Sequence, residues 1–269
     1  MSQAWRHLRM PLPWGRLTVY VAGDGPPLLL LHGLGGSGRY WAGLAPELAA
    51  TRTLIAPDLA GFGRSDKPRS DYSRAFHLDN LDAVLAALRV DGHLALAGHS
   101  MGGVLAALFA AQNLHRVDAL AMAAAPFPRA QEHPHRTPGG RAGRAFYSFV
   151  QWTLPLVSPL VRSSTYPRAV IADYLRHTRD SYRLTSRSLI WDAGVIDELG
   201  GLRSCDSVRQ LLLYSEEDRT IAADSLQLWQ QTLPQAELLL VRGGHQLLLR
   251  GGFVDLATWL ERPLASRVA

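Results

Sequence analysis

Residues 94–111 read LALAGHSMGGVLAALFAA, which is a strand, a tight turn and a helix in immediate succession. The first four residues are apolar without alternation, as in a strand that is buried on both faces of a parallel sheet. The turn that follows matches G-x-S-x-G from Gly98 to Gly102, and an apolar helix begins directly after it. On such a turn a serine takes strained backbone angles, and the glycines beside it relieve the clashes. The stretch therefore predicts a buried sheet and a Ser100 hydroxyl that is held clear of the main chain.

The G-x-S-x-G pattern is weak by itself, because a chain with 24 Gly matches it by chance fairly often. Ser100 also fits a second interpretation, an N-cap residue in a glycine-rich turn whose hydroxyl accepts a backbone hydrogen bond. The strand before the turn and the helix after it favour a nucleophile, because a helix N-terminus adds free N–H groups and positive potential beside the hydroxyl.

Strand and helix patterns alternate on both sides of this stretch, which predicts a doubly wound α/β fold with a mostly parallel sheet. Short apolar runs predict strands at residues 17–22, 28–31, 53–57, 94–97, 119–123, 210–214 and 237–241. Helical length and periodicity predict helices at residues 38–50, 74–90, 101–113, 223–233 and 252–261. The length of 269 residues suits one core of this class that carries an inserted segment.

The alternation stops after residue 126, where the chain becomes rich in proline and glycine. Helical stretches at 146–154 and 168–176 follow, without a convincing strand. We therefore predict a core made of residues 1–126 and 205–269, with a helical cap inserted at 127–204. Ten Arg and three acidic residues lie between positions 129 and 187, so the basic excess of a chain with net charge +5 lies in this insertion.

Two further motifs lie where such a fold places loops. Residues 28–31 lead into His32-Gly33-Leu34-Gly35-Gly36, and residues 58–68 read DLAGFGRSDKP. Together with the serine turn, these motifs make the chain resemble the serine-dependent α/β-hydrolases with a helical cap (esterase and C–C hydrolase type), over nearly its whole length. In that family the first motif is the oxyanion loop after the third strand, and the second is the D-x-x-G-x-G-x-S turn after the fourth.

The resemblance implies catalytic residues in the order Ser, Asp, His, with Ser100 as the nucleophile, Asp218 as the acid and His245 as the base. A serine hydroxyl is a poor nucleophile at neutral pH, so it needs a base to take its proton and an acid to orient that base. Asp218 follows the strand predicted at 210–214, and His245 follows the one at 237–241. Both residues therefore lie where the family places them.

Alternatives remain open for two of these positions. Glu216 and Glu217 also fit the acid, because three carboxylates are adjacent in the chain and Ser215 stands where the family usually has a glycine. A surface histidine without a catalytic part is the alternative for His245.

The oxyanion of an acyl-transfer reaction needs two preorganised N–H donors. By resemblance these are the backbone amides of Leu34 and Met101, while His32 supports the loop and is also a candidate for substrate contact. A phosphate-binding glycine loop is the alternative for residues 32–36, but neither a Lys-Ser/Thr pair nor G-x-G-x-x-G spacing is present.

A serine nucleophile favours carbonyl substrates, which are esters, lactones or thioesters of a small molecule cleaved through an acyl-enzyme. The resemblance disfavours dehalogenases and epoxide hydrolases, which carry Asp at the position of Ser100. C–C hydrolases usually have a proline in the oxyanion loop, which reads Gly-Gly-Ser at 35–37, so that alternative is weakened without being excluded. A non-hydrolytic eliminase or cyclase that uses His245 as its base is another alternative, and the intact catalytic set argues against a pure binding protein.

Aromatic residues of the cap are candidates for the substrate pocket, among them Tyr147, Trp152 and Trp191. Each of them fits a packing contact between cap and core equally well. The arginines favour an anionic substrate or an acidic carrier protein that delivers a thioester, against the alternative of solvated surface charge.

Composition excludes several other classes of protein. Cys205 is the only cysteine, which excludes an intrachain disulfide and a cysteine-based zinc site, and neither a metal nor an organic cofactor is implied. No stretch is apolar enough to span a bilayer, and the first residues contain no signal-like apolar run. The basic segment lacks a nucleic-acid-binding motif. We expect a cytoplasmic protein that acts on a small-molecule substrate.

Overall fold

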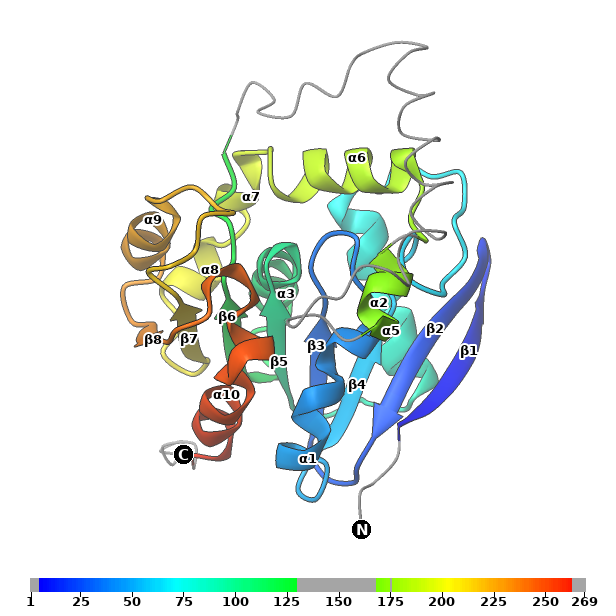
Figure 1. Cartoon of the computed structure of the whole chain (residues 1–269), viewed down its shortest axis with the longest axis horizontal. Helices are drawn as coiled ribbons and strands as arrows, with labels where there is room; N and C mark the ends of the chain where they lie inside the picture. The colour runs from blue at the N-terminus through cyan, green and yellow to red at the C-terminus, as the bar shows by residue number, and fades with distance from the viewer. Residues whose placement is uncertain (1–4, 130–167, 175, 263–269) are drawn as a thin grey trace.

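The computed structural model describes residues 5–129, 168–174 and 176–262. Its centre is an eight-stranded sheet with the order β1-β2-β4-β3-β5-β6-β7-β8 (Figure 1). β2 pairs antiparallel with β1 and with β4, and the other neighbouring strands are parallel. The strands are β1 (Arg6–Leu12), β2 (Gly15–Ala22), β3 (Pro27–Leu31), β4 (Thr53–Pro57), β5 (Leu94–His99), β6 (Val117–Ala123), β7 (Arg209–Tyr214) and β8 (Glu237–Leu240).

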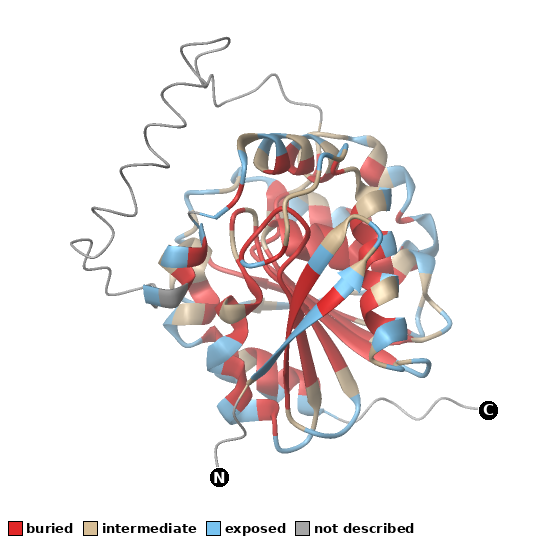
Figure 2. Ribbon diagram, turned by 90° about the vertical axis from the view of Figure 1, so that its right-hand side faces the viewer, coloured by how far each residue is buried: buried red, intermediate tan, exposed pale blue. Residues whose placement is uncertain are grey.

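The central strands are buried on both faces. In β3, Leu29 and Leu31 lie in one apolar cluster, whereas Leu28 and Leu30 lie in a second cluster on the opposite face. Successive side chains of a strand point to opposite faces, so a strand covered on both sides is apolar at every position. Figure 2 shows this burial along the central strands, and exposed residues on the outer surfaces of the helices.

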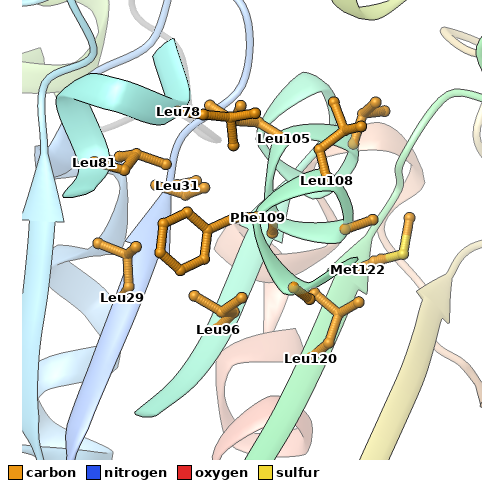
Figure 3. Packing of buried hydrophobic residues seen from close by; sticks show 14 of the residues in the cluster. Leu29, Leu31, Leu78, Leu81, Leu96, Leu105, Leu108, Phe109, Leu120 and Met122 are labelled. Atoms are coloured by element: carbon orange, nitrogen blue, oxygen red, sulfur yellow. The ribbon is translucent and has the colours of Figure 1, made fainter. Parts of the chain in front are cut away.

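Helices cover both faces of the sheet. Figure 3 shows the cluster on one face, where leucines of β3 and β5 pack against Leu78 and Leu81 of α2 and Phe109 of α3. The opposite face is covered by η1, α1, η2 and α10. Outside residues 127–204 the helices are η1 (Gly38–Leu44), α1 (Ala45–Leu48), α2 (Arg74–Ala87), α3 (Met101–Gln112), α9 (Ser225–Thr232), η2 (Gly244–Arg250) and α10 (Gly252–Glu261).

The doubly wound, mostly parallel sheet expected from the sequence is confirmed, and each of the seven predicted strands has a counterpart. β1 is an additional strand that the sequence analysis missed. Within the described part of the chain it pairs with β2 alone, and most of its residues are exposed, so it has neither a continuous apolar run nor a regular alternation. Pro11 lies within it, which an edge strand tolerates because one side of its backbone has no ladder to complete.

The segment predicted as an inserted cap, residues 127–204 and called the insertion below, contributes helices and no strand among its described residues. These helices are α5 (Arg168–Tyr174), α6 (Arg179–Leu189), α7 (Gly194–Asp197) and α8 (Gly200–Arg203). The helix expected at 168–176 corresponds to α5, whereas the one expected at 146–154 lies outside the described residues. α6 lies across the top of the molecule in Figure 1.

α6 was not singled out from the sequence, although its start carries a recognisable signal. The Thr178 side chain accepts a hydrogen bond from the Ser181 amide, and the Ser181 hydroxyl accepts one from the Thr178 amide, which is a capping box. Further along, Leu189, Leu199 and Leu202 lie in the same apolar cluster as α2 and α3. The C-terminal part of the insertion therefore packs directly into the core.

Candidate active site

Ser100 lies on the turn between β5 and α3, with backbone angles φ 54° and ψ −126°. These angles are strained for a residue with a side chain. A Cβ at Gly98 would overlap the carbonyl oxygen of Gly102, and a Cβ at Gly102 would overlap that of Leu31. The two glycines therefore let strand and helix approach closely enough to make the turn. The Ser100 side chain caps no backbone amide of α3, in contrast to the N-cap interpretation of the sequence.

The structure brings Ser100, His245 and Asp218 together from three separate loops. His245 Nε2 lies 3.1 Å from Ser100 Oγ, and His245 Nδ1 lies 2.8 Å from Asp218 Oδ2. The loops follow β5, β7 and β8, which run parallel, so all three side chains reach the same edge of the sheet. The arrangement provides a hydroxyl, a base within reach of its proton, and a carboxylate that orients the base.

Asp218 is the carboxylate that meets the histidine. Its side chain is 4% exposed, and its Oδ1 accepts a hydrogen bond of 2.7 Å from the Thr220 amide. Burial raises its pKa, but the hydrogen bond and charge of His245, together with the backbone amides, outweigh burial and leave the pKa below its ordinary value. Glu217 is exposed and accepts from the Gly243 amide at 3.0 Å, and Glu216 is also exposed. Of the three adjacent carboxylates, the structure thus places only Asp218 against the histidine ring.

His99 is a further residue of this site whose contact the sequence analysis missed. Its Nε2 lies 2.8 Å from the backbone oxygen of His245, and its ring stacks on Tyr40 with centroids 4.6 Å apart. Burial lowers its pKa to about 3, so the ring is neutral and its Nε2–H donates to that oxygen. His99 therefore holds the backbone of His245 while Asp218 holds the side chain. A histidine directly before the serine of the turn was the available signal.

The loop of residues 32–37 between β3 and η1, the oxyanion loop of the sequence analysis, is anchored by His32. This side chain is fully buried, with Nδ1 at 2.8 Å from the Gly33 oxygen and Nε2 at 3.0 Å from the Leu59 amide. Burial lowers its pKa to about 4, so the ring is neutral, with Nδ1–H donating and Nε2 accepting. His32 does not line the cavity described below. The contacts of His32 are thus those of a residue that supports the loop, and its contact with substrate stays a prediction.

The two amides expected to bind an oxyanion belong to Leu34 of the oxyanion loop and to Met101, which directly follows Ser100. Leu34 lines the cavity together with the serine. Met101 is the first residue of α3, where amides have no intrahelical acceptor and the helix dipole favours negative charge. Met101 is fully buried and does not itself line the cavity, so its side chain does not face a ligand.

A cavity of about 740 Å³ opens over Ser100 and His245. Trp191, one of the predicted pocket residues, lines it, whereas Tyr147 and Trp152 lie outside the described residues. Most of the apolar lining was not predicted from the sequence, because it comes from helices and loops that carry no motif. That lining includes Pro126, Phe127, Val170, Tyr182, Ile190 and Ile221.

Charged residues also line the cavity. Arg129, Arg219 and Arg250 contribute to its wall, together with Glu217. Among the described residues, no group of three or more His, Cys, Asp or Glu side chains is arranged to hold a metal ion. The helices of the described part of the chain are also too short or too polar to cross a bilayer.

Comparison with known proteins gives matches in both sequence and structure. A family model described as alpha/beta hydrolase fold matches residues 26–251. Lipase 1 of Psychrobacter immobilis is 26% identical over 239 residues, which cover 84% of this chain and 72% of the lipase. The 2-hydroxymuconate semialdehyde hydrolase of a Pseudomonas species is 37% identical over 111 residues, or 40% of this chain and 39% of that enzyme.

Other similarities are shorter or more distant. An uncharacterized protein of Mycobacterium tuberculosis is 43% identical over 110 residues, covering 41% of this chain and 32% of that protein, so the chain spans about a third of this relative. The thioesterase domain from the curacin biosynthetic pathway superposes with a TM-score of 0.71 at 22% identity, covering 96% of this chain and 99% of that one. The epoxide hydrolase CorEH gives 0.73 at 20% identity, with coverages of 97% and 100%. At these identities the two structures show a common fold alone.

Proposed function

The chain belongs to the alpha/beta hydrolase fold family, and from this premise we propose that it is a serine hydrolase that acts through an acyl-enzyme on Ser100. The observation that carries the proposal is the chain of contacts from Ser100 Oγ through His245 to Asp218, with distances of 3.1 and 2.8 Å, in a cavity wall. A purely structural serine at this turn would not need a buried carboxylate behind a histidine.

In the proposed acylation step, Ser100 Oγ attacks the carbonyl carbon of the substrate while His245 Nε2 takes the hydroxyl proton. The carbonyl oxygen becomes an oxyanion that the amides of Leu34 and Met101 stabilise. The protonated His245 then gives its proton to the leaving group as the bond to that group breaks. Asp218 holds the ring orientation throughout and stabilises the imidazolium.

Deacylation repeats the sequence with water as the nucleophile. His245 takes a proton from water, the hydroxide adds to the acyl carbon, and the proton passes to Ser100 Oγ as the acyl bond breaks. The products are a carboxylic acid and the free enzyme, so atoms and protons balance without a cofactor.

Esters, lactones and thioesters of small molecules are the proposed substrate class. Apolar side chains such as Phe127 and Ile190 suit an acyl chain or ring, while the arginines of the wall suit a polar or anionic substituent. The similarity to a lipase over 84% of the chain supports an ester substrate. The similarities to epoxide hydrolases carry less weight, because Ser100 stands where that chemistry requires a carboxylate nucleophile.

Cleavage of a C–C bond is a second candidate, favoured by the 37% identity to 2-hydroxymuconate semialdehyde hydrolase. The substrate would then be a vinylogous diketone, and water would be the co-reactant as before. The oxyanion loop lacks the proline usual for that subgroup and reads Gly35-Gly36-Ser37 instead. We therefore rank ester hydrolysis first.

The proposal is tested by exposing the protein to a fluorophosphonate and measuring the intact mass, for the wild type and Ser100→Ala in parallel. We expect one adduct on the wild type and none on the variant, because only an activated serine reacts. A panel of p-nitrophenyl esters and thioesters of increasing chain length then defines the acyl specificity. A folded wild type that gives neither adduct nor turnover would overturn the proposal.

A further inference from the structure

We infer that Asp173 of α5 is a positioning residue for the oxyanion loop and acts on it through Arg39. The inference rests on the proposed function, because it assigns a catalytic consequence to the position of this loop. Its evidence is the set of contacts that the insertion makes with residues 33–39.

The first contact is a buried, two-pronged ion pair between the insertion and η1. Arg39 Nε lies 2.6 Å from Asp173 Oδ2, and Arg39 Nη2 lies 2.5 Å from Asp173 Oδ1. The Asp173 side chain is 0% exposed and that of Arg39 is 24% exposed. A bidentate pair that is this well shielded from water fixes both the distance and the relative orientation of the two side chains. The reason is that guanidinium and carboxylate must stay coplanar to keep both hydrogen bonds.

The second contact is steric and involves the next residue of α5. Gly35 has a φ of +76°, and a Cβ added there would lie 2.5 Å from Cε2 of Tyr174. The Tyr174 ring therefore covers Gly35 at the middle of the loop. One turn earlier, Val170 lies in the apolar cluster of η1 and α10, so α5 is itself held in place.

The core also holds the first residue of η1, which directly follows the loop. Asp58, which follows β4, accepts a hydrogen bond of 2.7 Å from the Gly38 amide and another of 2.6 Å from the Arg64 amide. The loop is thus held between Asp58 on the core and Asp173 on the insertion. Leu34, whose amide is an expected oxyanion donor, lies between the His32 anchor and the Tyr174 contact.

This arrangement predicts a specific kinetic defect when Asp173 loses its charge. The loop keeps its core anchors, so the cavity still binds substrate, but the Leu34 amide is no longer held in its position. An oxyanion donor acts in the transition state and hardly at all on the bound substrate, so kcat falls while KM changes little.

The experiment uses p-nitrophenyl butyrate as substrate and butylboronic acid as a mimic of the tetrahedral adduct. We expect Asp173→Asn to lower kcat at least tenfold with KM within twofold, and to weaken boronic acid binding by about the same factor as kcat. The double variant Arg39→Gln with Asp173→Asn should be no slower than Asp173→Asn alone, because Asp173→Asn already loses the charged pair with Arg39, together with its contact to the exposed Arg176. Arg39→Lys, which keeps the charge without the fork, should give an intermediate kcat.

Asp192→Asn is the matched control. Asp192 pairs with Arg74 of α2 at 2.6 Å, so it also joins the insertion to the core, but it does not contact the oxyanion loop. We expect its kcat to stay within twofold of the wild type. An Asp173→Asn protein that is folded and keeps a wild-type kcat, or that changes KM alone, would overturn the inference.

Failure of the proposed function is distinguishable from failure of this inference. A wild type without fluorophosphonate adduct or esterase activity refutes the former, whatever Asp173 does. In that case hydrogen exchange of the amides in residues 33–37 tests the positioning itself. Faster exchange there in Asp173→Asn, but not in Asp192→Asn, supports it, and unchanged exchange refutes it.

Discussion

The serine turn and the insertion face the same cavity, yet different interactions determine their positions. At the turn, Gly98 and Gly102 allow backbones to touch, and the strained angles of Ser100 follow from that close packing. In the insertion, ion pairs such as Arg39–Asp173 and Arg74–Asp192 join helices to the core. Closely packed backbones leave no room for an added side-chain atom. Substitution of one partner in a charged pair, in contrast, changes activity or stability by degrees. We therefore expect substitutions at the turn to abolish activity or folding. Substitutions in the insertion should reduce activity or stability only partly.

The largest expected effect is that of Ser100→Ala. Removal of the nucleophile should lower kcat for p-nitrophenyl butyrate by at least about 1000-fold, because the remaining site can only bind and polarise the ester. Steady-state kinetics measures the loss, and circular dichroism should show an unchanged fold. Adding His245→Ala should cause little further loss, since the two residues act as a unit.

Asp218→Asn should lower kcat by about 100-fold to 10,000-fold, because an amide neither orients the histidine in the required tautomer nor stabilises its cation. Glu216→Gln is the matched control, since Glu216 is an exposed carboxylate two residues before Asp218 and does not line the cavity. Its kcat should stay within about fivefold of the wild type. Equal losses in the two variants would contradict the assignment of the acid.

Gly102→Ala tests the backbone packing at the turn. The added methyl would overlap the Leu31 oxygen, and such overpacking lowers the free energy of unfolding by about 1–3 kcal/mol. Gly92→Ala is the control, because a Cβ at that position meets nothing within 4 Å. Urea unfolding of both variants measures the difference, and equal stabilities would show that the turn is not packed as described.

The buried histidines predict loss of stability in acid. Burial lowers the pKa of His32 to about 4 and of His77 and His99 to about 3, so all three are neutral in the folded protein at pH 5. They take up protons on unfolding, and the stability that they contribute above pH 6.5 is lost as pH falls. Asp58 acts in the opposite direction, because burial raises its pKa to about 6 and it releases a proton on unfolding.

At pH 5 these four groups together should therefore take up roughly two protons on unfolding, which lowers the free energy of unfolding by about 3 kcal/mol for each pH unit of acidification. Burial also lowers the pKa of His177, which adds to the effect in the same direction. His77→Gln removes one of these protons, since His77 contacts Thr185 of α6 and lies outside the catalytic residues. The slope should then fall by about 1.4 kcal/mol per pH unit. Urea unfolding between pH 4.5 and 6 measures the slopes, and identical slopes would contradict burial of a neutral His77.

The smallest expected effect is that of Asp224→Asn. Arg129 and Asp224 form a two-pronged pair between the insertion and α9, but the Asp224 side chain is 51% exposed. An exposed pair contributes little to the free energy of unfolding, and salt weakens it. Thermal unfolding at low and high salt should show a small difference that disappears at high salt. A large loss of stability that is independent of salt would contradict this expectation. It would mean that the pair matters to stability as much as the backbone contacts of the turn do.

Much of the fold could be predicted from local sequence, because the signals for a buried strand or a tight turn arise within one element. The unbroken apolar run of β3 reflects burial on two faces, and the glycines of the turn reflect a clash within a few residues. β1 escaped detection for the converse reason, since an exposed edge strand needs neither an apolar run nor alternation. α6 has its capping box but a mostly polar composition, so it offered no apolar run to single out.

The sequence by itself determined the doubly wound sheet, the serine turn, and the loops that carry Asp218 and His245, because short apolar runs and glycine spacings specify them locally. Only the tertiary structure decided which of three adjacent carboxylates meets the histidine ring, since all three have the same chemistry in the chain. It also placed His99 against the His245 backbone and joined Arg39 to Asp173, 134 residues away. Such contacts depend on where separate elements pack, and no local pattern records the distance between two residues that folding brings together.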